Sequence, residues 1–221
     1  MSIDIGHLIV CGTDTDVGKT IVSAWLVQGL DALYWKPIQS GLEEGGDRER
    51  VLRLLDLPDE RALPERYAFQ KPVSPHWAAE LEQRQIDPDR LDLPQSKGPV
   101  IVETAGGLMV PLTRQWLQLD QLARWNQPIL LVARSGLGTI NHTLLSLEAL
   151  HQRNLNVLGV IFNGPIHPDN PNTIKEFGGV SVIAQLPFLS ELTRKALFRQ
   201  WQEQKLTLIF EKLADAWSQS K

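Results

Sequence analysis

The chain has 221 residues, with 22 Lys and Arg against 26 Asp and Glu, and a formal net charge of −4. This acidic balance argues against a nucleic-acid surface, and the 43% hydrophobic content excludes a disordered chain. The single cysteine, Cys11, excludes an intrachain disulfide framework and a cysteine-based zinc site. No apolar run approaches the roughly 18 residues that span a bilayer, and no basic secretory segment opens the chain. We therefore expect one cytoplasmic domain over residues 1–221, without a membrane partner.

Short apolar runs alternate with stretches of helical period along most of the chain. The runs are continuous, as is typical of strands that are covered on both faces. They occupy residues 7–11, 32–35, 99–102, 128–132, 156–162 and 180–184. The helical stretches at 19–30 and 139–150 complete an α/β pattern, which predicts a doubly wound, mostly parallel sheet with helices on both faces. In such sheets ligands bind beyond the carboxyl ends of the strands.

Two regions depart from this alternation. Residues 56–98 contain six prolines, which predict short helices and irregular connections. Residues 190–217 predict one or two amphipathic helices that pack on the sheet. We expect Trp201 and Trp217 to be packing residues of this tail.

The first apolar run leads directly into a glycine loop. Residues 12–20 read Gly-Thr-Asp-Thr-Asp-Val-Gly-Lys-Thr and are followed at once by a helix. This context is typical of a phosphate loop, or P-loop, whose backbone N–H groups and helix N-terminus bind an anion. Lys19 would reach the β- and γ-phosphates, and the Thr20 hydroxyl would coordinate Mg²⁺. The alternative is a glycine-rich turn with a capping threonine.

Charged residues follow the second and third strands. Lys36 would either hold an anion in the cleft or extend past the sheet's rim into water. Asp47 would either cap the helix over 47–55 or coordinate Mg²⁺. Glu103 ends the third strand, where nucleotide enzymes hold Mg²⁺. Together with Thr20, these two carboxylates form a plausible Mg²⁺ site that water and phosphate complete.

The loops after the later strands carry weaker signals. Residues 134–142 contain two glycines and form either a second anion site or a tight turn in which Thr139 caps a helix. His142 lies within that helix and reads as structural. Asn163 and Gly164 could match an adenine edge, and residues 186–189 could supply an apolar wall for the ring.

Taken together, these motifs resemble the dethiobiotin synthetase family of biotin biosynthesis. The matching motifs stand at 12–20, 36–41, 72–76, 102–107 and 138–142, in the expected order over nearly the whole chain. The resemblance implies a P-loop NTPase fold and an ATP- and Mg²⁺-dependent cyclo-ligase. Its substrates would be 7,8-diaminononanoate, CO2 and ATP, and its products dethiobiotin, ADP and phosphate. The family phosphorylates a substrate carbamate before the second amine closes the ureido ring.

The resemblance also implies a role for each matching residue. Lys19 and Lys36 would be catalytic, flanking the carbamate and the γ-phosphate, and Thr20, Asp47 and Glu103 would hold Mg²⁺. The substrate would be bound by Thr15, Lys36, Ser40, Gly106 and Asn141. ATP would be bound by Asp16, Val17, Gly18, Lys19, Thr20, Ile21, Asp47, Glu103, Thr104, Ala105, Gly106, Asn163, Gly164, Pro187, Phe188 and Leu189. The family is a homodimer, so residues 136–141 would reach the substrate carboxylate across the interface. Thr104 departs from the glycine that is usual in the family.

Three other classes of nucleotide enzyme fit less well. Partitioning and nitrogenase-iron-protein ATPases usually carry a second lysine early in the P-loop, where this chain has the acidic stretch 13–16. Such a stretch suits a diamine, whose ammonium groups it attracts. Amidating ligases of cobalamin synthesis add a glutaminase domain, for which 221 residues leave no room. No Asn-Lys-x-Asp signature of a GTPase is present.

Overall fold

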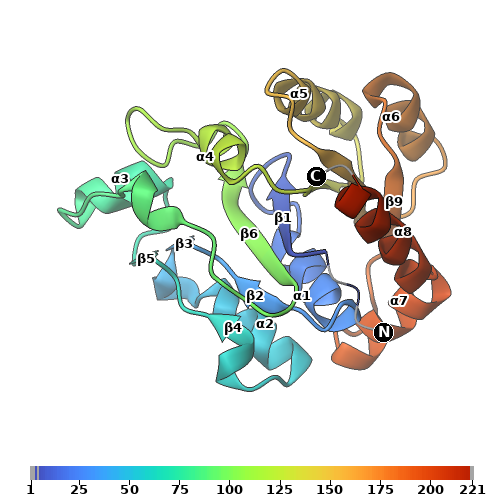
Figure 1. The fold of residues 1–221 in the computed structure, drawn as a ribbon, viewed down its shortest axis with the longest axis horizontal. Coiled ribbons are helices and arrows are strands. Elements are labelled where there is room, and N and C mark those ends of the chain that lie inside the picture. Colours follow the sequence, from blue (N-terminus) through green and yellow to red (C-terminus); the bar gives the residue numbers. More distant parts are fainter. Residues whose placement is uncertain (1–2, 4, 220–221) are drawn as a thin grey trace.

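The computed structural model describes residue 3 and residues 5–219, and its centre is a seven-stranded sheet (Figure 1). All pairings in this sheet are parallel, and the strand order is β4-β2-β6-β1-β7-β8-β9. The strands are β1 His7–Gly12, β2 Leu33–Trp35, β4 Ala62–Leu63, β6 Val100–Gly107, β7 Ile129–Arg134, β8 Val157–Asn163 and β9 Val182–Leu186. The predicted α/β fold with a parallel sheet is confirmed.

Helices cover both faces of the sheet. They are α1 Lys19–Gly29, α2 Asp47–Leu55, α3 Pro75–Leu81, α4 Gln118–Trp125, α5 Thr139–His151, α6 Asn170–Gly178, α7 Arg194–Glu203 and α8 Leu206–Gln219. Successive residues of β1 enter two separate cores, because side chains alternate across a strand. Val10 packs into the core that α1 helps to form, whereas Ile9 packs into the core that contains Leu119 of α4 and Leu147 of α5. Burial on both faces explains why the strands read as continuous apolar runs.

The strand that carries Glu103 is longer than predicted. The apolar pattern ends at Val102, yet β6 continues to Gly107. The pairing with β1 shifts on the way, since Val10 is paired with Glu103 and Gly12 with Gly107. Residues 104–106 therefore form a bulge beside the P-loop, and Gly106 adopts a positive φ of 62° there. This bulge brings the backbone after Glu103 alongside the phosphate loop.

Residues 56–98 contain more regular structure than the prolines suggest. Short 3₁₀ helices occur at Asp59–Arg61 and Pro88–Leu91, and α3 follows Ser74, as predicted for this region. The short strands β3 Ile38–Ser40 and β5 Tyr67–Phe69 form a separate parallel pair, which the sequence did not predict. The segment after Lys36 therefore leaves the main sheet and enters this second, two-stranded sheet.

The C-terminal segment forms the two helices α7 and α8. Trp201 of α7 is 2% exposed and packs edge-on against Trp25 of α1, with ring centroids 6.0 Å apart. It also stacks on Phe210 of α8 at 5.4 Å, so its predicted packing role is confirmed. Trp217 is partly buried in α8.

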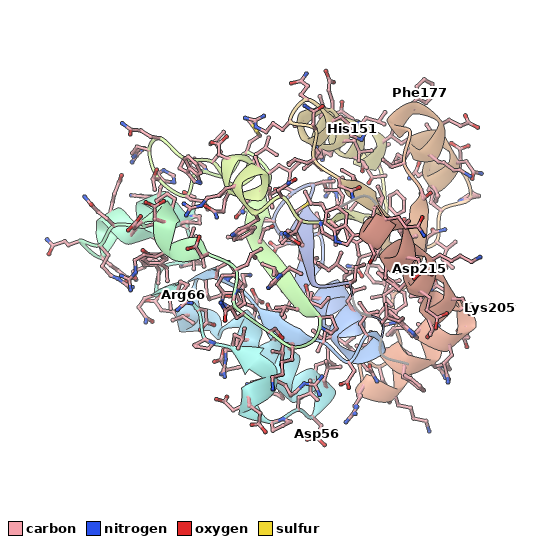
Figure 2. All side chains as sticks on the ribbon, in the orientation of Figure 1. Asp56, Arg66, His151, Phe177, Lys205 and Asp215 are labelled. Carbon is pink, nitrogen blue, oxygen red and sulfur yellow. The ribbon has the colours of Figure 1, made fainter. Side chains whose placement is uncertain are left out.

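Charged side chains lie around the periphery of the molecule. Figure 2 labels Asp56 and Lys205, which are exposed in the turns after α2 and α7, and Asp215, which is exposed on α8. Within the described part of the chain, we find no helix that has both the length and the apolar character needed to cross a membrane.

Candidate active site

The glycine loop forms an open cradle between β1 and α1. Gly18 precedes α1 with φ 93°, and no side chain caps the helix N-terminus. Asp16 also has a positive φ of 57°, and the N–H of Thr13 donates to the carbonyl of Val132 in β7 at 3.0 Å. The first N–H groups of α1 are thus left without a side-chain partner and face an anion site. The alternative of a turn with a capping threonine is wrong, because the N-cap residue of α1 is Gly18 and no side chain caps the helix.

Asn163 lies at the end of β8, which β7 separates from β1 in the sheet, and its side chain contacts the P-loop. Its Nδ2 donates to the carbonyl of Val17 at 3.2 Å. A Cβ on Gly18 would lie 2.0 Å from the same Nδ2, so only glycine allows this approach. The N–H of Gly164 donates to Leu186 at the end of β9. The segments predicted to bind adenine therefore begin beside the P-loop.

Lys19 folds back over the loop. The residue is 6% exposed, and its Nζ donates to the carbonyl of Asp14 at 2.8 Å. Burial lowers the pKa of Lys19, an effect that the nearby Glu103 carboxylate opposes. A lysine that folds over the anion-binding loop is placed to exchange this backbone carbonyl for a phosphate oxygen.

Lys36 lies between two carboxylates at the end of β2. Its Nζ contacts Asp47 Oδ2 and Glu103 Oε1, the latter at 3.1 Å. The residue is 8% exposed, so the alternative of a lysine that extends into water is wrong. Burial alone would lower the pKa of Lys36, but the two carboxylates raise it above its ordinary value. The ammonium group therefore stays charged at neutral pH.

Asp47 is the first residue of α2 and does not cap it. The N-cap position is Gly46, and the Asp47 carboxylate points to Lys36 instead. Burial would raise the pKa of Asp47, but the Lys36 ammonium group holds it below its ordinary value. The cap interpretation is therefore wrong, and an ionised carboxylate faces the site.

Glu103 joins the P-loop to this charged cluster. Its Oε1 accepts hydrogen bonds from Thr20 Oγ1 at 2.9 Å and from Lys36 Nζ, while Oε2 accepts one from the Tyr34 hydroxyl at 3.0 Å. Glu103 is 1% exposed. Each oxygen of this buried carboxylate thus has a partner, as buried charges require.

A cavity of about 570 Å³ opens beside these groups. Twelve of the site residues that the sequence predicts line this cavity: Thr15, Asp16, Gly18, Lys19, Thr20, Ile21, Lys36, Ser40, Asp47, Glu103, Ala105 and Gly106. The other predicted residues lie outside this lining: Val17, Thr104, Asn141, Asn163, Gly164, Pro187, Phe188 and Leu189. Thr104 is 1% exposed within β6, and Asn141 is exposed on α5.

The structure adds residues that the sequence did not assign to the site. Arg50 lines the cavity, with its Nη1 3.5 Å from Asp47 Oδ1. Gln39 accepts from the N–H of Asp47 at 3.3 Å, and Pro72 to Pro75 form the far wall. The helical i,i+3 spacing of Asp47 and Arg50 is a signal that could have found the arginine. Tyr34 read as an ordinary core residue because it lies within an apolar run.

The oxygen atoms of Thr20, Asp47 and Glu103 fit a Mg²⁺ ion. Lys36 contacts both carboxylates, and Arg50 lies 3.5 Å from Asp47, so the acidic oxygens belong to a mixed charged cluster. Among the described residues, no three His, Cys, Asp or Glu side chains gather as a metal site of their own. Mg²⁺ commonly takes one or two carboxylates and completes its shell with water and substrate phosphates. The donor set matches that pattern.

A parallel sheet whose first strand runs into a phosphate loop, with lysines and carboxylates at the loop, defines a P-loop NTPase. A family model described as AAA domain matches residues 6–196. Two solved structures share the fold alone. A ParA family ATPase from Chlorobium tepidum has a TM-score of 0.55 at 11% identity, covering 96% of this chain and 98% of its own. The septum site-determining protein MinD from Pyrococcus horikoshii, complexed with Mg-ADP, has a TM-score of 0.56 at 16% identity, covering 96% and 95%.

Much closer relatives carry the name ATP-dependent dethiobiotin synthetase BioD. The protein from Rhodopseudomonas palustris (strain BisA53) is 50% identical over 191 residues, which cover 86% of this chain and 90% of the relative. The protein from Brucella anthropi is 48% identical over 195 residues, which cover 88% and 92%. The chain belongs to the ATP-dependent dethiobiotin synthetase family. The family predicted from the sequence is confirmed, and with it an ATP-dependent enzyme that forms carbon–nitrogen bonds.

Proposed function

We propose that this chain makes dethiobiotin from 7,8-diaminononanoate, CO2 and ATP, and releases ADP and phosphate. One observation carries the proposal beyond family membership. The P-loop lysine Lys19 and the strand-end lysine Lys36 face a single cavity, and the carboxylates of Asp47 and Glu103 line it as well. Such a cavity can hold a triphosphate end and a second anion side by side.

The reaction needs three bond-forming steps. One amine of the substrate attacks CO2 and loses a proton, which gives a carbamate. A carbamate oxygen attacks the γ-phosphorus, and ADP leaves, which gives a carbamic–phosphoric anhydride. The second amine attacks the carbonyl carbon and loses a proton, phosphate leaves, and the ureido ring closes. These steps depend on positioning and charge balance rather than on a protein nucleophile.

The side chains of the cavity suit those demands. Lys19 would bind the β- and γ-phosphates, and Lys36, which stays charged, would bind the carbamate oxygens. Thr20, Asp47 and Glu103 would hold Mg²⁺, whose charge when bound offsets that of the phosphate oxygens.

The diamine end would lie against Thr15, Ser40 and Gly106. The exposed acidic residues Asp14 and Asp16 belong to the same loop and would attract the ammonium groups of the diamine.

Asn163, Gly164 and residues 187–189 would seat the adenine ring. Two observations support this placement. Asn163 touches the P-loop carbonyl of Val17, and Phe188 is 77% exposed, which leaves an apolar ring free to pack on a base. The other predicted nucleotide contacts, Thr104 and Ala105, lie on the bulge of β6 beside the loop.

We also propose a cytoplasmic homodimer. Asn141 is exposed on α5 and lies outside the lining of its own chain's cavity. A second copy would therefore have to supply the loop 136–141 for this residue to reach the substrate carboxylate.

Phosphate release tests the proposal. Purified protein is incubated with ATP, Mg²⁺ and bicarbonate, with and without 7,8-diaminononanoate. We expect phosphate release to depend on the diamine. A monoamine analogue, which can form a carbamate but cannot close a ring, serves as the matched control and yields no dethiobiotin. Phosphate release at the same rate without diamine would point to a switch ATPase and contradict the proposal.

A further inference from the structure

Tyr34 lies behind the charged cluster, in the middle of β2. It is 0% exposed and belongs to the core that contains Val51 and Leu55 of α2. The strand β2 lies beside β6 (Figure 1), and Tyr34 is paired there with Ile101, two residues before Glu103. Its phenol group reaches Glu103 from this core, and the hydroxyl donates to Oε2 at 3.0 Å.

The two oxygens of Glu103 have different surroundings. Oε2 faces the core and is held by Tyr34, whereas Oε1 faces the cavity and accepts from Thr20 and Lys36. A rotation of the carboxylate about its terminal bond would break contacts on both sides at once. The Tyr34 hydroxyl therefore fixes the orientation of the carboxylate plane, so that one oxygen points into the cavity.

A neutral donor is well suited to this position. A cation behind Glu103 would also orient the carboxylate, but it would cancel the negative charge that the site needs. Burial, together with the negative charges of Glu103 and Asp47, raises the pKa of Tyr34 well above its ordinary value.

We propose that Tyr34 is a positioning residue that holds Glu103 so that Oε1 faces Thr20, Lys36 and the cation bound beside them. The proposal rests on the Mg²⁺ role proposed above for Glu103. A phenylalanine would fill the same space but would leave Oε2 without its donor, so the carboxylate would be free to turn.

Tyr34→Phe tests this role, and Tyr67→Phe is its matched control. Tyr67 is the other tyrosine of the chain. It is 5% exposed, its hydroxyl accepts from the N–H of Asp87 at 2.9 Å, and it does not line the cavity. Calorimetry gives the ATP affinity of each variant in Mg²⁺ and in EDTA, and a magnesium titration of turnover gives the half-saturating concentration.

We expect Tyr34→Phe to raise the half-saturating Mg²⁺ concentration by about 10- to 100-fold, the usual effect of losing a group that orients a metal ligand. Its ATP affinity in EDTA should equal that of the wild type, since the P-loop is untouched. Tyr67→Phe should leave both quantities unchanged. A Tyr34→Phe variant with the same Mg²⁺ dependence as Tyr67→Phe would overturn the proposal.

Glu103→Gln separates this proposal from the metal site on which it rests. If Tyr34 acts only through Glu103, adding Tyr34→Phe to Glu103→Gln should change the Mg²⁺ dependence no further. A large further loss in the double variant would overturn the positioning role but leave the metal site standing. A Glu103→Gln variant with wild-type Mg²⁺ dependence would overturn both.

Discussion

Lys36 Nζ lies 3.1 Å from Glu103 Oε1, and both side chains are buried, Lys36 directly after β2 and Glu103 within the neighbouring strand β6. The strand register produces this contact. Trp35 of β2 is paired with Val102 of β6. The residues that follow them, Lys36 and Glu103, therefore lie side by side. The same ammonium group contacts Asp47, which joins α2 to the two strands. One lysine thus neutralises part of a buried acidic cluster, and its removal has consequences for stability and for chemistry.

Lys36→Met should destabilise the nucleotide-free protein at neutral pH. The substitution keeps the length of the side chain but leaves two buried carboxylates without their cation. Breaking a buried pair in this way costs about 3–5 kcal/mol. Chemical denaturation at pH 7 measures the loss. Lys71→Met removes an exposed partner of Glu43 and should cost no more than about 1 kcal/mol.

The pH dependence of this loss has a defined sign. In the wild type, the pKa of Asp47 is lowered, so its contribution to stability is present above the ordinary value of 3.8 and disappears as the pH falls through the lowered pKa. In Lys36→Met, burial acts without the lysine and raises that pKa instead. The difference in free energy of unfolding between the variant and the wild type should therefore narrow as the pH falls from 7 towards 4. A difference independent of pH would mean that the loss comes from packing.

Lys19→Ala should weaken ATP binding itself. Charge-assisted hydrogen bonds of this kind contribute about 1.5–3 kcal/mol, which corresponds to roughly a 10- to 100-fold loss of affinity. Calorimetric titration with ATP checks the value. Lys97→Ala removes an exposed lysine from a loop outside the cavity and should bind ATP like the wild type. Unchanged affinity in Lys19→Ala would remove the P-loop lysine from the nucleotide site.

Gly18→Ala should distort the P-loop. Its φ of +93° is strained for any L side chain, and the new Cβ would lie 2.0 Å from Asn163 Nδ2. Gly179→Ala is the matched control, because Gly179 also has a positive φ of 62° but no atom within 4 Å of a Cβ. Both variants should lose about 1–2 kcal/mol of stability to backbone strain. Only Gly18→Ala should also lose ATP affinity, and an equal affinity in the two variants would contradict the role of the Asn163 contact.

Asp47→Asn separates the metal role from a helix-capping role. Asparagine caps helices as well as aspartate does, so a mere cap would be preserved. A Mg²⁺ ligand would not be, and we expect the half-saturating Mg²⁺ concentration to rise at least about 10-fold. ATP affinity in EDTA should be unchanged or tighter, since one negative charge near the phosphates is gone. The exposed Asp31 gives the control Asp31→Asn, which should behave as the wild type.

The parts of the site that could be predicted are those set by local sequence or by strand ends. A P-loop is a continuous segment whose residue types follow from its contact with phosphate, so Lys19 and Thr20 were found directly. Lys36 and Glu103 were found because parallel strands end at one edge of the sheet. The sequence left open whether Lys36 and Asp47 face the site, since that depends on side-chain direction.

Other contacts depend on register and could not be predicted. Tyr34 looks like any core aromatic until the pairing of β2 with β6 brings its hydroxyl to Glu103. The extension of β6 through 104–107 arises from a bulge against β1, which no apolar pattern reports. The strands β3 and β5 have three residues each, too few for a periodicity to show.

Product analysis with isotopically labelled bicarbonate tests the central claim most directly. The protein is incubated with ATP, Mg²⁺, 7,8-diaminononanoate and the labelled bicarbonate, and the products are identified by mass spectrometry. We expect dethiobiotin that carries the label in its ureido carbon, formed by the wild type and not by Lys36→Met. ADP and phosphate without labelled dethiobiotin would contradict the central claim.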